Sequence, residues 1–379
     1  MSSGILPPPV SGSPSDGHAH RHRHPVGRFA ALRAYISQHR LAAIIIAGGL
    51  VILIASITAY LLIQSIPKPA DIPDNIAPPK PKPVVYYSPL TGLKVADEKT
   101  TQQAVTAIMI ENSPDARPQS GLKQAGVVYE AIAEGGITRF LALYQEAKPT
   151  LVGPVRSVRE YYVDWLTPYQ ASVAHVGGSW NALKLVRNGK YRDIDQFFNS
   201  GSYWRATDRY APHNVYTNFK RLDALNKSKG YTTPTFPSWP RADGKAADKP
   251  TATNIHINIS SSLYNTQYKY DAKNNRYNRY LAGVLHKDRE KGTITPSVVI
   301  AMHVDMKVVF EDGYREQITT VGSGKATIFQ NGTAQNVTWR KKSRSAQLEF
   351  LDKNGKSVEL VRGQTWIAAV PNGSGSVSW

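Results

Sequence analysis

The chain of 379 residues contains no cysteine. This absence excludes disulfide bonds, a cysteine nucleophile, thiolate metal sites and a membrane anchor made by lipid modification of a cysteine. The Walker loop, the Rossmann glycine fingerprint, the G-x-S-x-G elbow and the H-E-x-x-H zinc motif are missing as well. The fold must therefore be held by its hydrophobic core, and none of these catalytic signatures identifies a reaction.

Acidic residues are also few, since 28 Asp+Glu stand against 46 Lys+Arg and give a net charge of +18. An excess of this size favours contact with nucleic acid, anionic lipid headgroups, or a phosphorylated or acidic polymer. Hydrophobic residues make up 41% of the chain and charged residues 20%. That balance is typical of a chain that can bury a core, and the length allows one large domain or two ordinary ones.

Residues 41–63 form a long stretch without any charge. As an α-helix with a rise of about 1.5 Å per residue, this stretch is roughly 34 Å long, enough to cross a bilayer. It is longer than the apolar core of a cleaved signal peptide, and no small-residue cleavage pattern follows it. We therefore predict an uncleaved transmembrane helix at 41–63, which makes the protein a single-pass protein of the cell membrane.

The charges that flank this helix predict its orientation. Five arginines precede it and three lysines follow it: Arg21, Arg23, Arg28, Arg33 and Arg40, then Lys68, Lys80 and Lys82. The positive-inside rule places the N-terminus in the cytoplasm and everything after residue 64 outside the cell. This location argues against nucleic acid as a partner and leaves envelope polymers, lipid-linked phosphates and the outer membrane surface. Without the five leader arginines and Asp16, a charge of +14 remains on the rest.

Two segments have a low-complexity composition. Residues 1–40, rich in Pro, Ser, Gly and His, are predicted to be a disordered cytoplasmic leader. Its histidines at positions 18, 20, 22 and 24 can chelate a metal ion, but we favour a solvated tail. Residues 64–85 are predicted to be an extended, semi-rigid Pro/Lys linker.

Hydrophobic periodicity divides the remainder into two halves. Residues 86–227 contain short apolar runs of strand length at 104–111, 127–133, 139–145 and 171–175, and a helix-like spacing at 180–187. Residues 228–250 are rich in Pro, Gly and charge and form the predicted boundary. Residues 251–379 alternate with period two between turn signals. The predicted fold class is α+β, with an α/β-like first half and a β-rich second half after one transmembrane helix.

Candidate ligand-binding residues lie in the first half, where apolar runs end at glycines: Glu134, Arg139, Arg156, Arg159, His213 and Asn214. In α/β folds such positions are where loops build ligand sites. In "GPVRSVREYY", a helix that starts near Pro154 would place free N–H groups beside two arginines and suit a phosphate or carboxylate. Alternatively, Arg156 pairs with Glu160 four residues on, worth about 0.3–0.5 kcal/mol.

Three other polar residues leave alternatives open. Glu130 and Glu134 lie four residues apart and share one face of a strand or helix. Such a pair can bind Mg²⁺ or act as acid and base. A solvated face, or salt bridges to Arg139, is the more common arrangement. His213 lies in a turn and can titrate near neutral pH. His175 ends an apolar run and is expected to be a satisfied core or capping residue.

The ordered motifs of the outward part resemble the YerB family of bacterial envelope lipoproteins. They are "SPLTGL", "MIENSPDARPQSG", "VGPVRSVREYYVDW", "HVGGS" and "RYAPHNVYT", then "YNRYLAG", "VGSGKATIFQNG" and "GQTWIAAVP". The resemblance spans about residues 87–371 and implies two adjacent domains of unknown function on the outer face of the membrane. Many members carry a lipid-modified cysteine, which this chain lacks. The order "TRF", "PVRS", "GGS" is similar, over fewer than a hundred residues, to the LytR–CpsA–Psr phosphotransferases.

These observations lead to one functional hypothesis and one alternative. The first is a membrane-anchored envelope protein that binds an anionic wall component or a wall-synthesis protein through the arginine-lined site and needs no cofactor. The alternative is a phosphotransferase or hydrolase acting on lipid-linked phosphate, in which Arg156 and Arg159 stabilise transferred charge and Mg²⁺ is a possible cofactor. No catalytic residue and no resident metal site is assigned from the sequence.

Overall fold

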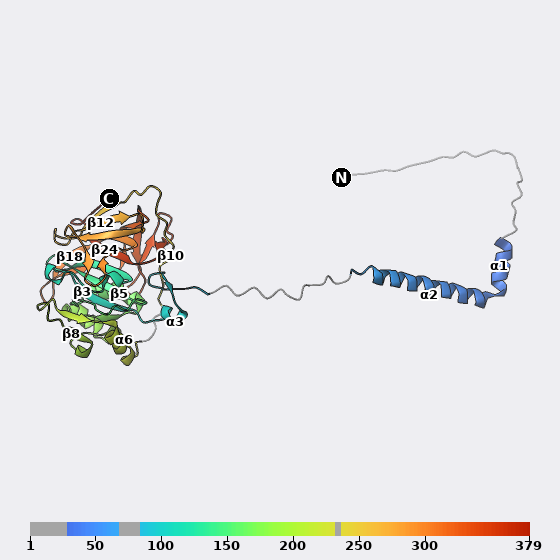
Figure 1. Ribbon diagram of the computed structural model, residues 1–379, viewed down its shortest axis with the longest axis horizontal. Coiled ribbons are helices and arrows are strands. Elements are labelled where there is room, and N and C mark those ends of the chain that lie inside the picture. The colour runs from blue at the N-terminus through green and yellow to red at the C-terminus, as the bar shows by residue number, and fades with distance from the viewer. Residues whose placement is uncertain (1–28, 68–83, 232–235) are drawn as a thin grey trace, which may run out of the picture. The chain divides into compact units, whose positions relative to one another are not determined.

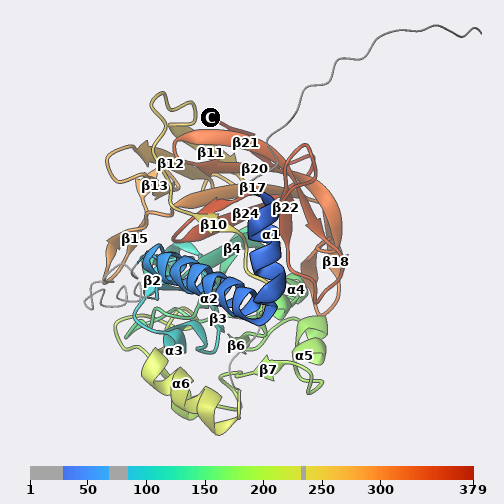
Figure 2. The same ribbon diagram turned by 90° about the vertical axis from the view of Figure 1, so that its right-hand side faces the viewer.

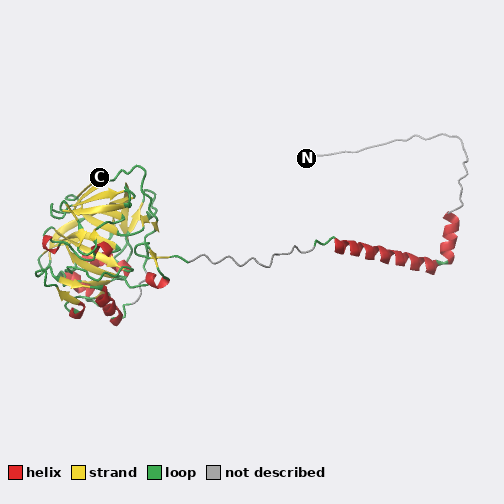
Figure 3. Ribbon diagram, in the orientation of Figure 1, coloured by secondary structure: helices red, strands yellow, loops and turns green. Residues whose placement is uncertain are grey.

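Strands dominate the chain after residue 84, as the computed structural model shows (Figures 1 and 3). The structure describes residues 29–67, 84–231 and 236–379. The leader histidines at positions 18, 20, 22 and 24 and most of the predicted Pro/Lys linker lie outside the described residues. The residues up to 82 and those from 83 onwards form two separate units, which are described one by one.

The first unit contains two helices, α1 (Phe29–Gln38) and α2 (Arg40–Gln64). With a mean hydropathy of 2.6 in its most apolar window and no buried residue, α2 is long and apolar enough to cross a membrane, so the predicted span coincides with a candidate membrane helix. The predicted disordered leader extended to residue 40, but α1 is helical. Its sequence FAALRAYISQ contains alanines, leucine and arginine, which favour helix, and lacks the Pro and Gly of the preceding residues.

A ten-stranded sheet organises the second unit. In spatial order its strands are β22 (Glu349–Leu351), β21 (Thr333–Lys341), β20 (Gly322–Gln330), β17 (Val298–Val304), β24 (Thr365–Pro371), β4 (Val127–Glu134), β5 (Ile137–Tyr144), β3 (Thr106–Glu111), β6 (Ser172–Ala174) and β7 (Arg192–Asp193). The four apolar runs predicted as strands in the first half are confirmed as β3, β4, β5 and β6. Both predicted halves contribute five strands to this sheet.

The two halves meet where β24, near the end of the chain, lies between β17 and β4 and pairs with both in parallel. Figure 2 shows β17, β20 and β21 above this junction and β3, β6 and β7 below it. At β4 and β24 both faces of the sheet are buried, which explains why these two strands are apolar almost without interruption. One face packs against the aromatic side chains of α4 (Glu160–Leu166), and the other packs against α6 (Phe219–Ser228) and a second sheet.

The second sheet is antiparallel and has five strands in the order β14 (Val284–Leu285), β13 (Arg276–Leu281), β12 (Thr266–Asp271), β11 (Asn254–Asn258) and β25 (Ser376–Ser378). The remaining strands form two-stranded pairs: β1 (Tyr86–Tyr87) with β2 (Lys94–Val95), β8 (Tyr203–Arg205) with β9 (Val215–Thr217), β10 (Arg241–Ala242) with β23 (Leu360–Val361), β15 (Lys287–Asp288) with β16 (Gly292–Thr293), and β18 (Met306–Phe310) with β19 (Tyr314–Ile318). The antiparallel pairs β15–β16 and β18–β19 agree with the predicted β-rich second half.

Helices are short in this unit. They are α3 (Glu98–Thr101), α4, α5 (Trp180–Val186) and α6, with single 3₁₀ turns at Pro114–Ala116, Leu122–Gln124, Thr167–Tyr169 and Ser200–Ser202. The helix predicted at 180–187 is confirmed as α5. At the start of α6 the side chain of Asn218 accepts a hydrogen bond from the backbone N–H of Arg221 and so caps the helix.

Candidate functional site

The segment Gly153–Arg159 is extended, and the helix predicted near Pro154 is wrong. Helix α4 starts only at Glu160. The N–H of Val155 donates to the carbonyl of Val215, that of Arg156 to Met109, and that of Val158 to Gly177. Because these N–H groups bond neighbouring backbone segments, they do not form the free helix terminus expected to receive an anion.

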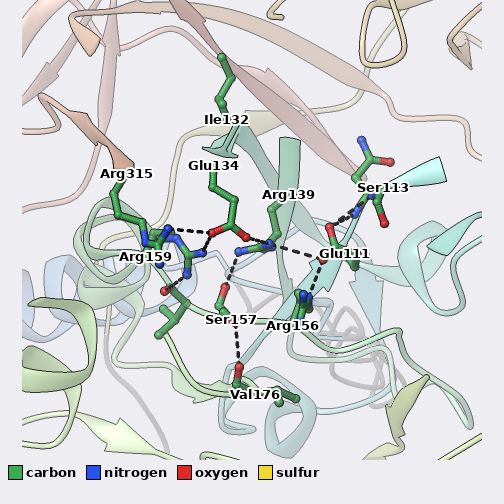
Figure 4. A network of polar contacts seen from close by, with 12 residues as sticks. Glu111, Ser113, Ile132, Glu134, Arg139, Arg156, Ser157, Arg159, Val176 and Arg315 are labelled. Atoms are coloured by element: carbon green, nitrogen blue, oxygen red, sulfur yellow. Dashed lines mark hydrogen bonds and ion pairs between the residues drawn. The ribbon is translucent and has the colours of Figure 1, made fainter. Parts of the chain in front are cut away.

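The two arginines of this segment belong to an ion-pair network, which we call the arginine network (Figure 4). Arg139, on β5, lies between two carboxylates: its Nη2 is 3.4 Å from Oε2 of Glu111 and 3.2 Å from Oε1 of Glu134. Arg156 donates through Nε to Glu111 at 2.7 Å, and Arg159 donates through Nη2 to Glu134 at 2.5 Å. The structure therefore brings four of the six predicted ligand-binding residues together.

Two members of the network come from positions that the sequence did not single out. Glu111 ends β3, and its Oε1 also accepts the backbone N–H groups of Asn112 and Ser113 at 2.9 and 3.3 Å. Arg315, on β19 of the second half, approaches Oε2 of Glu134 at 3.5 Å and also pairs with Asp312. Glu111 could have been found from the sequence, because it is a charged residue at the end of an apolar strand. Nothing local in the sequence connects Arg315 with Glu134.

Electrostatics keep both glutamates ionised. Burial alone would raise the pKa of Glu134, but the charges of Arg159 and Arg139 outweigh burial and lower it to about 2. Burial is likewise outweighed at Glu111, where Arg139 and Arg156 lower the pKa. With Arg315 and its partner Asp312 included, four guanidinium groups face three carboxylates. The network thus carries one excess positive charge at neutral pH.

Burial differs across the network. The side chains of Arg139 and Arg159 are 1% and 4% exposed, whereas those of Arg156 and Arg315 are 25% and 22% exposed. Within the described residues, the two terminal nitrogens of Arg156 have no hydrogen-bond partner. Solvent therefore reaches the side chains of Arg156 and Arg315, while Arg139 and Arg159 hold the carboxylates in place.

The carboxylate alternatives are resolved by the structure. Glu160 pairs with Arg344, so the predicted pair between Arg156 and Glu160 is wrong, whereas the predicted salt bridge between Glu134 and Arg139 is confirmed. Glu130 is fully buried and its Oε2 binds Arg279. A register shift separates it from Glu134, so the two glutamates share no site. No group of three or more metal-ligating side chains occurs in the described ranges 29–67, 84–231 and 236–379.

His213 and Asn214 lie beside the network and not in it. The Nδ1 of His213 is 3.1 Å from Oγ of Ser113, whose backbone N–H contacts Glu111. Asn214 is buried: its Oδ1 accepts from Arg205 at 2.8 Å, and its Nδ2 donates to two carbonyls of the loop that precedes it. The amide of Asn214 therefore closes its own loop, and ligand binding by either residue stays a prediction.

His175 is fully buried, with Nδ1 at 2.7 Å from the carbonyl of Gly177 and Nε2 at 3.0 Å from Oδ1 of Asp193. The prediction of a satisfied core residue is confirmed.

A second, completely buried ion pair joins the two halves. Arg279, on β13, donates through Nη2 to Oε2 of Glu130 at 2.7 Å, and the same oxygen accepts from Nε1 of Trp366 at 2.9 Å. The guanidinium lies over the Trp366 ring at 4.3 Å and also donates to Nδ1 of His286. Burial, then the charge of Arg279, lowers the pKa of His286 well below its ordinary range, so the ring is neutral and can accept this hydrogen bond. This cluster is structural, because solvent does not reach it.

Comparisons with known proteins agree with this architecture. Two family models match, "Protein of unknown function (DUF3048) N-terminal domain" over residues 90–232 and "Protein of unknown function (DUF3048) C-terminal domain" over residues 255–367. "Putative lipoprotein YerB" of Bacillus subtilis (strain 168) is 34% identical over 293 residues, which cover 75% of this chain and 86% of YerB. The crystal structure of YerB from Bacillus subtilis superimposes with a TM-score of 0.70 at 31% identity and covers 78% of this chain and 100% of that chain. The likeness to the LytR–CpsA–Psr phosphotransferases gains no support from these matches.

Proposed function

The chain belongs to the YerB family of two-domain proteins with DUF3048 N- and C-terminal domains, and from this membership we propose that it is a membrane-anchored protein of the bacterial cell envelope. In this proposal α2 crosses the membrane once, the N-terminus is cytoplasmic, and residues 84–379 lie outside the cell, where they bind an anionic wall component. The length and hydropathy of α2 support the anchor, as does the excess of arginines before it. The similar YerB protein is named a lipoprotein, and this chain, without cysteine, takes a helix in place of a lipid.

The observation that carries the binding proposal is the arginine network itself. Two buried arginines are neutralised by Glu111 and Glu134, and the excess charge stays with two partly exposed arginines. Figure 4 shows Arg156 and Arg315 on opposite sides of Arg139. Guanidinium groups fixed in this way bind phosphate or carboxylate with little loss of side-chain freedom. A wall polymer with repeated anionic groups can contact both arginines at once.

The enzymatic alternative has less support. A general base works best when its pKa lies near the working pH, and the arginines hold the pKa of Glu134 at about 2. Glu130 is engaged in the buried pair with Arg279 and does not face the network. We therefore propose binding without a chemical step, with an anionic wall polymer as the partner.

The test is a cosedimentation assay of residues 84–379 with cell walls that retain their anionic polymers. We expect Arg156→Gln/Arg315→Gln to bind about tenfold more weakly, because roughly 1.4 kcal/mol of lost charge-assisted hydrogen bonding is a factor of ten in affinity. The matched control is Arg340→Gln/Arg362→Gln, which also removes two positive charges from arginines paired with Glu349 and Asp243.

Equal binding by the network variant and the wild type would overturn the proposal. Retention only on vesicles with undecaprenyl-type phosphate, or only on a wall-synthesis enzyme, would replace the polymer by one of those partners.

A further inference from the structure

A cationic cavity lies beside the loop that follows β3. It is an open cavity of about 680 Å³, and we call it the arginine basin after Arg117, Arg209 and Arg289, which line it together with Tyr210 and His213. Arg117 comes from the "DARPQSG" loop, residues 209–213 come from the loop between β8 and β9, and Arg289 comes from the β15–β16 turn of the second half. Its size is that of a pocket for a small organic ligand.

The walls of the basin are fixed by buried amide side chains. In one loop, Nε2 of Gln119 donates to the carbonyl of Glu111 and to Oδ1 of Asn112, both at 3.0 Å. In the other, Asn214 donates to the carbonyls of Ala206 and Arg209, and the N–H of Ala206 donates back to the carbonyl of Asn214. Because these loops are already closed, a ligand need not order them when it binds.

The arginines of the basin are held differently from those of the arginine network. Arg209 donates to the carbonyls of Asp115 and Pro118 at 3.0 and 2.6 Å, and Arg117 donates to the carbonyls of Asn112 and Leu263. Carbonyl groups orient a guanidinium without cancelling its charge. Among the described residues, neither arginine forms a salt bridge with a carboxylate.

The third arginine is paired at the surface. Arg289 contacts Oδ2 of Asp208 at 2.5 Å, with the two side chains 37% and 51% exposed. An exposed pair of this kind contributes about 0–1 kcal/mol, so a stronger anion can displace the aspartate. Arg289 also lies 3.7 Å from Oε1 of Glu290, so two carboxylates pair with it, while Arg117 and Arg209 keep their charge and Asp115 is the other acidic residue of the lining.

An aromatic ring stands beside these charges. Tyr210 is 92% exposed, and the backbone N–H of His213 donates to its carbonyl, so the turn that carries it is defined while its ring has no packing role. An exposed aromatic ring next to fixed guanidinium groups is suited to a ligand that has both a ring and a charge, since the ring offers a flat apolar face and the arginines take the oxygens.

We propose that the arginine basin binds a phosphate ester of a sugar, with the phosphate on Arg209 and Arg289 and the sugar ring against Tyr210. The choice of a sugar, in place of another ring, rests on the outward location stated under Proposed function. The site itself is separate, because its lining shares no residue with the arginine network.

The test is calorimetric titration of the full chain in detergent with N-acetylglucosamine 1-phosphate, inorganic phosphate and N-acetylglucosamine. We expect the sugar phosphate to bind at least fivefold more tightly than inorganic phosphate, and the neutral sugar not to bind. Tyr210→Ala and Arg289→Gln should each weaken the sugar phosphate at least fivefold. Arg340→Gln is the matched control, since Arg340 forms an exposed pair with Glu349 at 2.9 Å, much as Arg289 does with Asp208.

Absence of binding by the sugar phosphate, equal affinity for inorganic phosphate, or an equal loss in Arg340→Gln would each overturn the inference. A further arm presents the same sugar phosphate on a polyprenyl lipid in vesicles, and tighter binding there identifies a lipid-linked source, while equal binding identifies a free one. Cosedimentation with walls then tests the arginine network separately, so the two proposals can fail independently.

Discussion

The buried pair between Glu130 and Arg279 gives the sharpest stability prediction. Both side chains are fully buried, and they join β4 of the first half to β13 of the second. The substitution Glu130→Gln leaves the guanidinium of Arg279 in the core without a counter-charge. Removal of one partner from a buried pair costs about 3–5 kcal/mol.

The assay is urea denaturation of residues 84–379, followed by tryptophan fluorescence. With a slope of about 3 kcal/mol per molar urea, the loss lowers the midpoint by about 1–1.7 M. The double variant Glu130→Gln/Arg279→Met removes both charges and should recover most of the difference. Arg340→Gln, at an exposed pair, should change the free energy of unfolding by less than about 1 kcal/mol.

A loss of less than about 1 kcal/mol in the free energy of unfolding for Glu130→Gln would refute this reasoning, because an unpaired buried charge destabilises a fold by more than that. A double variant as unstable as the single one would show that shape, and not charge, dominates the cluster.

Three further outcomes are expected. Glu134 has a pKa of about 2 in place of 4.5, so its contribution to stability is complete above pH 4.5 and is lost as the pH falls towards 2. In acid denaturation, Glu134→Gln should be less stable than the wild type at pH 7, and the difference in free energy of unfolding should shrink between pH 4.5 and 2. Because the pKa of His286 is lowered in the folded chain, only the unfolded chain binds a proton at this residue below about pH 6.5, and the free energy of unfolding falls as the pH drops from 6.5. His286→Gln should reduce this pH dependence by up to about 1.4 kcal/mol per pH unit. Denaturant titrations at several pH values measure it. Asn214→Ala should release its loop, so that trypsin cleaves after Arg209 several times faster while the urea midpoint moves little; an unchanged cleavage rate would contradict the role given to the amide.

The strands of the first half could be predicted because their hydrophobic runs are local. The runs that became β3, β4, β5 and β6 are short, apolar and bounded by glycine or polar residues. Their arrangement in one sheet could not be predicted, since β24 enters beside β4 from a position more than 200 residues along the chain. Pairing over such a distance leaves no periodic signal in either segment.

The arginine network was likewise predictable only where its signal is local in the sequence. Local pattern pointed to Arg139, Arg156 and Arg159, and the structure places them in one network. The segment around Pro154 was expected to be helical, but its N–H groups bond three distant backbone segments, and this tertiary pairing overrides the helical preference of proline at a first turn. Arg315, from the second half, completes the network through a contact that only the folded chain creates.

The most direct test of the proposed function is wild-type binding to two preparations of the same cell wall, one that keeps its phosphate-bearing and acidic polymers and one from which they have been stripped. Residues 84–379 should sediment with the first preparation and lose most of that binding as salt rises from about 50 to 200 mM, because exposed charge contacts are screened. They should remain in solution with the stripped wall. Equal sedimentation with both preparations would contradict the claim that this protein binds an anionic wall component.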